Sequence, residues 1–189
     1  EILAEACRLA TSVGGYSSAM VALIEPGTRT PRPTAWSGSV DNQGAQQLTF
    51  SIAEQPQDDT SIIGRVLRTG TALICNDLQT LDMSLAARAP LLDAGFRSVV
   101  AYPLLVDRTP VGALLLTSYD TGAVGDEESR MLRELVANLS FALQYLHKED
   151  EVRFLSYFDP LTGLAKRGLF CERLVRALEA RIGRRGTAA

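Results

Sequence analysis

The feature that most constrains the fold is a pair of apolar segments separated by a short polar turn. SVVAYPLLV occupies residues 98–106, VGALLLTSY occupies residues 111–119, and DRTP joins them. Two segments of this kind at this separation predict a β-hairpin. Both arms are apolar enough to be central strands of a sheet. Pro103 has no backbone N–H to donate, so we expect a bulge or bend beside it.

The remaining segments predict helices and strands around this hairpin. Apolar residues at steps of four, three and four predict a helix over residues 2–13, with Ile2, Ala6, Leu9 and Val13 on one face. Thr60 or Ser61 can cap a second helix that ends at Gly70. A short helix is predicted over residues 84–94, and further strands over 18–25, 34–38, 47–52 and 71–75.

This order of elements predicts an α+β sandwich. Strands that are joined mostly by hairpins, with helices at the two ends of the chain, indicate an antiparallel sheet with the terminal helices on one face. The longer excursions of residues 53–97 are then expected over the other face, where they could roof a pocket.

The last of these helices is long and is predicted to begin at residues 126–128. Its apolar side chains step by three and four residues, as a heptad seam does: Leu132, Leu135, Leu139, Ala142 and Leu146. We expect this seam to pack on a partner helix, and an amphipathic helix on the sheet is the alternative for its first half. The seam fails at HKEDE, residues 147–151, and resumes out of phase at Val152 and Leu155.

The stretch FDPLTGLAKR, residues 158–167, predicts the end of this helix. Pro160 disfavours helical geometry at Asp159, so the helix must stop by about that residue. Gly163 permits a tight turn, and apolar residues at helical spacing predict a new helix after it.

Composition and charge exclude several classes of protein. The formal net charge of −3 argues against nucleic-acid binding, which requires a clustered basic surface. No apolar run approaches 18 residues, so no membrane span is expected in this fragment. Residues 1–13 do not resemble a signal peptide, and the missing initiating Met indicates a piece of a longer polypeptide. We therefore expect a cytoplasmic protein, with a membrane anchor elsewhere in the full-length chain as an open alternative.

The cysteines favour a reducing compartment. Cys7, Cys75 and Cys171 are odd in number, are widely separated and form no CxxC pair. This argues against a disulfide framework and against a zinc site. We expect three buried or partly buried thiols, because free cysteine is among the most buried residue types.

Residues 1–147 resemble a GAF domain. The resemblance rests on three ordered stretches: TSIIGRVLRTGTALICNDL, LLDAGFRSVVAYPLLVDRTPVGALLLTSY and DEESRMLRELVANLSFALQYL. It implies a six-stranded antiparallel sheet flanked by helices, with a long C-terminal signalling helix. It also implies a sensory role, in which the domain binds a small molecule.

The stretch FDPLTGLAKRGLFCERL resembles the start of a GGDEF domain, the catalytic unit of diguanylate cyclases. The matching residues are Asp159, Leu161, Thr162, Gly163, Leu164 and Arg167, whereas Lys166 stands where the family has Asn. In the family the pair equivalent to Asp159 and Arg167 bridges the turn, which implies a mechanical clamp. Two unpaired surface charges are the alternative.

The resemblance places GTP and Mg²⁺ outside this fragment. The family's metal-binding aspartate and its GGDEF hairpin would both follow residue 189, so the fragment is expected to have no enzyme activity. A diguanylate cyclase is implied for the longer protein. The tail also resembles proteins that carry a second, EAL phosphodiesterase domain.

The ligand of the sensory domain is unknown from the sequence. Haem and bilin are disfavoured because His147, the single histidine, lies on the exit helix. The cyclic-nucleotide signature of the family is also absent. Candidate pocket residues are the polar and aromatic groups near strand ends: Trp36, Phe50, Cys75, Asp77, Met83 and Tyr102. Each has core packing or a turn cap as its alternative role.

These inferences combine into one hypothesis for the chain. Residues 1–147 form a GAF sensory domain, residues 148–158 a helical linker, and residues 159–189 the beginning of a GGDEF domain. The domain forms a homodimer through its terminal helices and controls the cyclase through the linker, for which Leu139, Leu146, Asp159 and Arg167 are the candidate coupling residues. The alternatives are a dimerisation scaffold without ligand and a regulator of a GGDEF–EAL phosphodiesterase.

Overall fold

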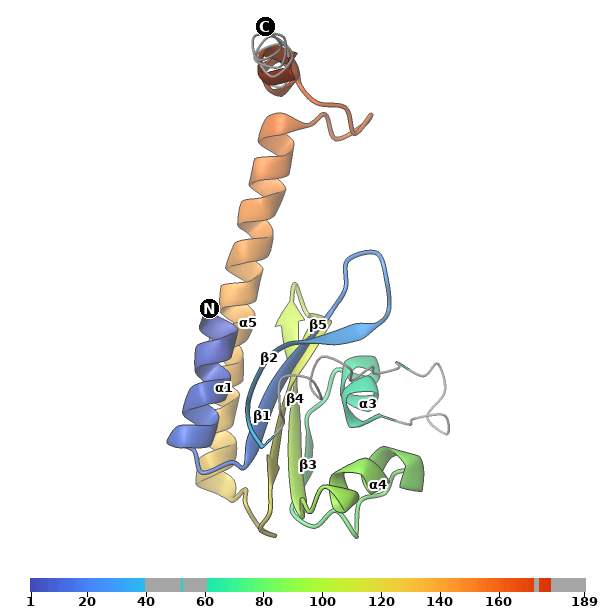
Figure 1. Cartoon of the computed structure of the whole chain (residues 1–189), viewed down its shortest axis with the longest axis vertical. Helices are drawn as coiled ribbons and strands as arrows, with labels where there is room; N and C mark the ends of the chain where they lie inside the picture. Colours follow the sequence, from blue (N-terminus) through green and yellow to red (C-terminus); the bar gives the residue numbers. More distant parts are fainter. Residues whose placement is uncertain (40–51, 53–60, 172–173, 178–189) are drawn as a thin grey trace, which may run out of the picture. The chain divides into compact units, whose positions relative to one another are not determined.

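A computed structural model of the chain describes residues 1–39, 52, 61–171 and 174–177. The chain divides into two compact units, residues 1–144 and residues 145–189. The first unit contains a five-stranded antiparallel sheet of order β2-β1-β5-β4-β3 (Figure 1). Its strands are β1 (Ser18–Ile24), β2 (Pro31–Gly38), β3 (Leu73–Cys75), β4 (Ser98–Val106) and β5 (Thr109–Ser118).

The α+β fold is therefore confirmed, with five strands in the described residues instead of six. The predicted strand over residues 47–52 lies outside the described residues except for Ile52, and so does the candidate residue Phe50. Within the described part of the chain, no helix is long and apolar enough to cross a membrane.

The predicted hairpin is formed by β4 and β5, with a tighter turn than DRTP suggests. Val106 pairs with Thr109, so the turn has two residues, Asp107 and Arg108, with φ of 47° and 63°. Such left-handed turns match the twist of the two strands that they join. The register shifts between Leu104 and Leu105, which confirms the irregularity expected beside Pro103.

The hairpin is buried on both faces of the sheet, which explains why both arms are so apolar. Successive side chains of a strand point to opposite faces. Leu114 and Leu116 accordingly join the core on one face of β5, while Ala113 and Leu115 join the core on the other face.

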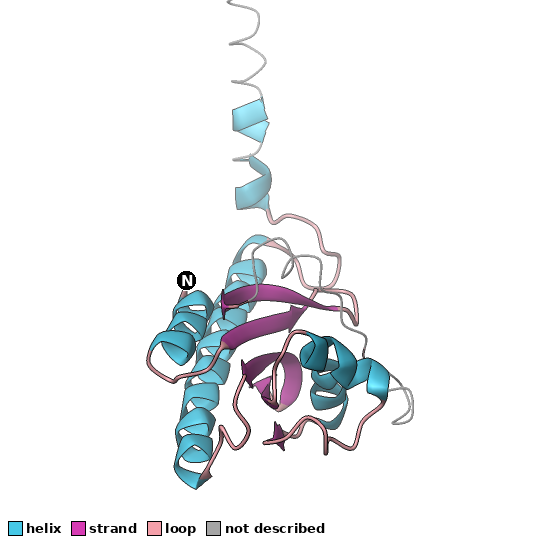
Figure 2. Cartoon of the chain, turned by 60° about the horizontal axis from the view of Figure 1, so that its bottom comes forward, coloured by secondary structure: helices cyan, strands magenta, loops and turns pink. Residues whose placement is uncertain are grey.

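The terminal helices α1 (Ile2–Ser12) and α5 (Asp126–Tyr157) cover one face of the sheet, as predicted. Figures 1 and 2 both show them side by side against the strands. On α1, however, it is Ala6, Cys7 and Ala10 that are buried, whereas Leu9 and Val13 are exposed. Small side chains let the helix approach the sheet closely, so the predicted stripe of larger residues lies mostly outside the core.

The first part of α5 packs on its own sheet. Leu132 and Leu139 are 7% and 3% exposed, and Leu135 and Leu143 pack against the same core. These leucines are therefore not available to a partner helix. The first half of the predicted seam is instead the apolar face of an amphipathic helix that packs on the sheet, which was the alternative. In the second unit, Leu146 is 50% exposed.

Helices α3 (Ile62–Thr69) and α4 (Leu85–Asp93) cover the other face of the sheet. Ser61 caps α3 as predicted, because its Oγ accepts a hydrogen bond of 3.1 Å from the backbone N–H of Gly64. Gly70 ends α3 in the left-handed conformation, with φ of 65°. The apolar residues Ile63 and Val66 of α3 are fully buried against the strands.

In the second unit, a tight turn ends α5 at the predicted place. The Asp159 carboxylate accepts hydrogen bonds from the N–H groups of Leu161 and Thr162 and from the Thr162 hydroxyl, which together lower its pKa. No ion pair joins Asp159 to Arg167 among the described side chains. The expected clamp is replaced by this local cap, because the neighbouring turn amides already satisfy the carboxylate.

Lys166 stabilises the end of α5 from the other side of the turn. Its Nζ donates a hydrogen bond of 2.7 Å to the carbonyl oxygen of Leu155, and its backbone N–H donates to the carbonyl of Tyr157. A cation at the last carbonyls of a helix is favourable, because those carbonyls carry partial negative charge. A new helix begins at residue 167, as predicted. Cys171 lies on this helix and is exposed, so the expectation of a buried or partly buried thiol was wrong for this residue.

Candidate functional site

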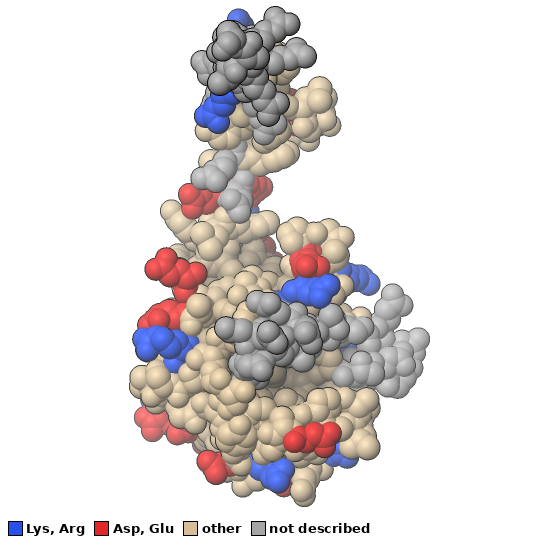
Figure 3. Space-filling model, in the orientation of Figure 1, with Lys and Arg blue, Asp and Glu red and all other residues tan. Residues whose placement is uncertain are grey.

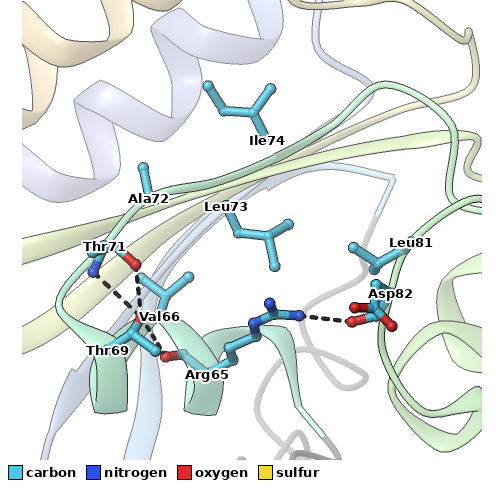
Figure 4. A pocket seen from close by; sticks show the side chains of 9 residues that line it. All are labelled: Arg65, Val66, Thr69, Thr71, Ala72, Leu73, Ile74, Leu81 and Asp82. Atoms are coloured by element: carbon cyan, nitrogen blue, oxygen red, sulfur yellow. Dashed lines mark hydrogen bonds between the residues drawn. The ribbon is translucent and has the colours of Figure 1, made fainter.

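A cavity of about 300 Å³ lies in the first unit between α3, the edge strand β3 and residues 81–82 (Figure 4). Because β3 is the last strand of the sheet, the cavity opens at the sheet edge. Its lining consists of Arg65, Val66, Thr69, Thr71, Ala72, Leu73, Ile74, Leu81 and Asp82.

The turn between α3 and β3 positions two hydroxyl groups at this cavity. The Thr69 hydroxyl donates to the Arg65 carbonyl at 2.9 Å, in the manner of a threonine in a last helical turn. The same oxygen accepts from the Thr71 N–H at 3.3 Å and from the Thr71 hydroxyl at 2.9 Å. Gly70 makes this compact arrangement possible, because its φ of 65° reverses the chain immediately after the helix.

Arg65 spans the cavity and joins α3 to the opposite wall. Its Nη1 donates a hydrogen bond of 2.8 Å to the carbonyl oxygen of Asp82 (Figure 4). Arg88 on α4 contacts the same loop, because its Nη1 donates to the carbonyls of Gln79 at 2.8 Å and of Leu81 at 3.4 Å. Buried Val66 and half-buried Leu73 and Leu81 supply an aliphatic surface beside the guanidinium.

This combination of groups is suited to binding. The guanidinium can hold an anionic group and the aliphatic side chains an apolar body, whereas the protons of both hydroxyls are already donated within the turn. The lining contains no histidine or cysteine that could act as a base or nucleophile. Within the described part of the chain, no three His, Cys, Asp or Glu residues are grouped as metal ligands.

Cys75 and Asp77 lie at the end of β3 and form a turn. The Cys75 thiol donates to the Asp77 carbonyl at 3.0 Å, and burial raises the pKa of this thiol. The Asp77 carboxylate accepts from the Gln79 N–H at 3.0 Å. Cys75 is therefore kept protonated at neutral pH, and Asp77 stabilises the turn, the alternative role considered for it.

The other candidate residues are not brought together at the cavity. Trp36 and Met83 are partly buried and pack with Cys75 in the core between the sheet and helices α3 and α4. Tyr102 is buried on the opposite face, under α1 and α5. No candidate in the described residues lines the cavity between α3 and β3.

Tyr102 instead takes part in a buried polar contact between β4 and α5. Its hydroxyl lies 3.3 Å from the Ser129 hydroxyl, which also accepts a hydrogen bond of 3.3 Å from Arg133. Further along the strand, the Leu105 N–H donates to the Ser140 hydroxyl at 3.0 Å. Tyr102 and Ser140 both line a shallow groove of about 390 Å³ between β4 and α5.

The surface shown in Figure 3 carries interspersed acidic and basic side chains over the first unit. On this face of the described residues, the positive charges do not gather into a patch. This distribution agrees with the net charge of −3.

Sequence reasoning missed Arg65, Thr69, Thr71 and Asp82. The string RTGT at the end of α3 contains a signal, since hydroxyls on either side of a helix-ending glycine must lie close together. The contact between Arg65 and Asp82 has no such signal. It joins residues 17 apart in the chain and depends on where the loop after β3 returns.

A model of the GAF domain family matches residues 1–144 of the chain. The GAF domain of a phosphoenolpyruvate-protein phosphotransferase from Coxiella burnetii superposes with a TM-score of 0.65 at 12% identity, covering 79% of this chain and 84% of that one. A GAF domain/HD domain protein from Geobacter sulfurreducens gives 0.61 at 18% identity, covering 78% and 93%.

The same fold is shared by an enzyme. Free methionine-R-sulfoxide reductase from Neisseria meningitidis, solved in complex with its substrate, superposes with a TM-score of 0.57 at 17% identity over 77% of this chain and 78% of that chain. Likeness at such identities shows a common fold. No curated protein sequence matches the chain.

Proposed function

The chain belongs to the GAF domain family, and from this membership we propose that residues 1–144 are the sensory module of a signalling protein. The ligand that we propose is a small molecule whose anionic group is held by the Arg65 guanidinium and whose apolar body lies against Val66, Leu73 and Leu81. Haem and bilin are not expected as ligands.

The observation that carries this proposal is a direct connection between the cavity strand and the signalling helix. Asn76 follows β3 immediately, and Val124 lies two residues before α5. The Asn76 side chain donates to the Val124 carbonyl at 2.9 Å and accepts from the Val124 N–H at 3.1 Å. A displacement of β3 on ligand binding therefore acts on the residues that begin α5.

Contacts along β4 give α5 further points of attachment to the sheet. Tyr102 and Leu105 bond to Ser129 and Ser140, and Gln144 donates to the Asp107 carboxylate at 2.9 Å. These polar contacts alternate with the buried leucines of α5. A ligand that binds one arrangement of sheet and helix better than another shifts the population between them.

We propose that the output is a GGDEF diguanylate cyclase in the longer protein. The support is the resemblance of residues 158–167 to the start of that domain, placed directly after α5 ends at Tyr157. GTP and Mg²⁺ would bind outside this fragment, which itself has no proposed enzyme activity. A homodimer would bring two cyclase domains together, each with one GTP.

The test uses the full-length protein with cyclic di-GMP production as the readout. Deleting residues 1–144 should change the rate of production, and Asn76→Ala should reduce the response to ligand while leaving the basal rate. Asn76→Asp is the matched control, because it retains the acceptor for the Val124 N–H and should keep part of the response. If the deletion changes neither the rate of cyclic di-GMP production nor the dimerisation of the protein, the proposed sensory function is wrong.

A dimerisation scaffold without ligand is the second candidate function. It is favoured by the packing of Trp36, Cys75 and Met83, which belong to the apolar core between the sheet and helices α3 and α4. Thermal-shift screening against nucleotides, bilins and anionic metabolites separates the two, since a scaffold shows no stabilisation by any of them. If the longer protein hydrolyses cyclic di-GMP and does not make it, the GGDEF–EAL alternative replaces the cyclase.

A further inference from the structure

The groove between β4 and α5, with a volume of about 390 Å³, lies on the opposite face of the sheet from the cavity beside Arg65. Tyr102 and Val136, which line the groove, pack in the core that α1 and α5 cover. Leu73, which lines the cavity, packs in the core under α3 and α4. All residues of the groove lie within the first unit. The groove is therefore separate from the sensory site proposed above.

The space for this groove arises where the sheet narrows. β3 pairs with β4 only as far as Ala101, so in the described residues no strand lies on that side of β4 from Tyr102 onward. On α5, Ala137 lines the groove, and its side chain is a single methyl group. Neither a neighbouring strand nor a large helical side chain therefore fills the space beside Pro103 and Leu105.

Arg133 places a positive charge at one end of the groove. Its Nη2 donates a hydrogen bond of 3.3 Å to the Ser129 hydroxyl, at the end of the groove where Tyr102 also meets Ser129. The residues three and four positions from Arg133 on α5 are Ser129, Arg130, Val136 and Ala137, so no carboxylate pairs with it along the helix. Within the described part of the chain, no ion pair involves Arg133. The guanidinium can therefore bind an external anion.

Ser140 supplies a hydrogen-bond donor at the other end of the groove. Its Oγ accepts from the Leu105 N–H at 3.0 Å, and no acceptor for its own proton is present among the described residues. Seven residues separate it from Arg133, which corresponds to about 10 Å along a helix. Val136 and Ala137 lie between them on α5. A cation and a hydroxyl thus stand at the two ends of an apolar surface.

We propose that this groove binds a medium-chain carboxylate that has a polar group at the far end of its chain. The Arg133 guanidinium holds the carboxylate, because its planar donors match the two carboxylate oxygens. The chain lies against Val136, Pro103 and Leu105, and the Ser140 hydroxyl donates to the distal polar group. Sites for small molecules have volumes of roughly 300–1,000 Å³. At about 390 Å³, the groove suits a slender ligand with one negative charge.

This inference goes beyond the proposed function, because it adds a second ligand site that does not depend on a ligand at Arg65. A ligand in the groove contacts β4 and α5 together, next to the bonds that Tyr102 and Leu105 make with the helix. It therefore stabilises the arrangement of α5 on the sheet that forms the groove. Ala72 lines both the groove and the cavity, so the two sites lie on either side of β3.

Titration calorimetry of the intact chain with ω-hydroxyoctanoate tests the role of the charge. Arg133→Gln should raise the dissociation constant about tenfold or more, because it removes charge-assisted hydrogen bonds. The matched control is Arg130→Gln, an exposed arginine of the same helix that does not line the groove, and it should leave the constant within about twofold. Equal effects of the two variants, or no binding of the probe to the wild-type chain, overturn the proposal.

Arg65→Gln separates this site from the sensory site. The variant should bind ω-hydroxyoctanoate within about twofold of the wild-type chain, because the groove does not include Arg65. If Arg65→Gln weakens binding and Arg133→Gln does not, the probe occupies the cavity at α3. In that case the groove proposal is wrong, whereas the sensory site gains support.

Two related probes test the orientation of the ligand. Octanoate lacks the distal hydroxyl and should bind about threefold to tenfold more weakly than ω-hydroxyoctanoate, because one hydrogen bond is lost. Ser140→Ala should abolish this difference; since it also removes the acceptor for the Leu105 N–H, the quantity compared is the ratio of the two dissociation constants within each variant. Octylammonium, with the opposite charge, should not bind. Equal binding of all three probes would exclude the assigned roles of Arg133 and Ser140.

Filling the groove tests its position without a change of charge. Ala137→Leu places a larger side chain in the groove and should weaken binding about tenfold or more, since the chain of the ligand loses its space. The control Asn138→Leu adds the same side chain at the next exposed position of α5, outside the groove, and should leave binding within about twofold. Circular dichroism confirms that both variants fold. Unchanged binding in folded Ala137→Leu would show that the ligand lies elsewhere.

Discussion

Cys7 is fully buried on the side of α1 that faces the sheet, and burial raises the pKa of its thiol to about 11. Burial also raises the pKa of Cys75, whereas Cys171 is exposed. The folded state therefore favours the protonated form of Cys7. The resulting stabilisation is complete below the unfolded pKa near 9 and is lost as the pH rises through about 11.

Alkylation should distinguish these three thiols. At pH 8 we expect Cys171 to react with iodoacetamide at the rate of a free thiol, because its sulfur is exposed to solvent. The reacting species is the thiolate, which a buried thiol forms less readily. Cys7 and Cys75 should react at least about tenfold more slowly, unless the protein is unfolded. Mass spectrometry identifies the modified residue, and Cys171→Ser should abolish the fast phase. Fast modification of Cys7 in the folded protein would contradict the packing of α1.

Burial also separates two leucines of α5 that the sequence treats alike. Leu139 is 3% exposed and Leu146 is 50% exposed. Leu139→Ala should lower the free energy of unfolding by about 2–4 kcal/mol, because it removes packed methyl groups and leaves a cavity. Leu146→Ala should cost less than about 1 kcal/mol. Urea titration monitored by circular dichroism measures both, and similar costs would argue against packing of the first half of α5 on the sheet.

At the scale of elements, the centre of the sheet depends on a close approach between β1 and β5. Gly112 of β5 pairs with Leu23 of β1 and with Leu104 of β4. A Cβ on Gly112 would lie 2.5 Å from the carbonyl oxygen of Ala22 and 2.5 Å from Cδ2 of Leu23. A glycine inside a strand often marks such an approach.

Gly112→Ala should therefore force the two strands apart. We expect the free energy of unfolding to fall by about 1–3 kcal/mol, as for other overpacked sites. The matched control is Gly168→Ala, since a Cβ there meets nothing within 4 Å and the residue lies in a helix. The control should be neutral or stabilising by up to about 1 kcal/mol. If the two variants change the free energy of unfolding equally, β1 can move to accommodate the added methyl group without loss of stability.

At the scale of the whole molecule, the two buried clusters and their packed neighbours all precede residue 145. They lie in the first unit, which ends at Gln144. The second unit contains exposed apolar residues, among them Tyr145, Val152 and Leu155. The buried packing that stabilises the fold therefore lies in the first unit.

A chain that ends at Gln144 should keep the fold of the first unit. We expect a cooperative thermal transition within a few degrees of that of the longer chain at low concentration, because both cores remain. Differential scanning calorimetry of both chains measures the two transitions. A truncated chain without a cooperative transition would show that residues after 144 belong to the folding unit.

The sequence by itself determined the order of the helices and strands in the described residues. The hairpin of β4 and β5, the cap at Ser61 and the end of α5 before Pro160 were all predicted correctly. These features depend on short-range causes: side-chain periodicity, capping groups and the restricted backbone of proline. Such causes act over a few residues and are therefore visible in the sequence.

Only the tertiary structure decided which of two similar stripes meets the sheet and where the cavity lies. On α1 the buried side belongs to Ala6, Cys7 and Ala10. On α5, Leu132 and Leu139 pack on the sheet while Met131 and Phe141 stay exposed. The cavity depends on Arg65 reaching the carbonyl of Asp82 from another element. Both outcomes follow from how closely surfaces distant in the chain can approach, which periodicity along one helix does not specify.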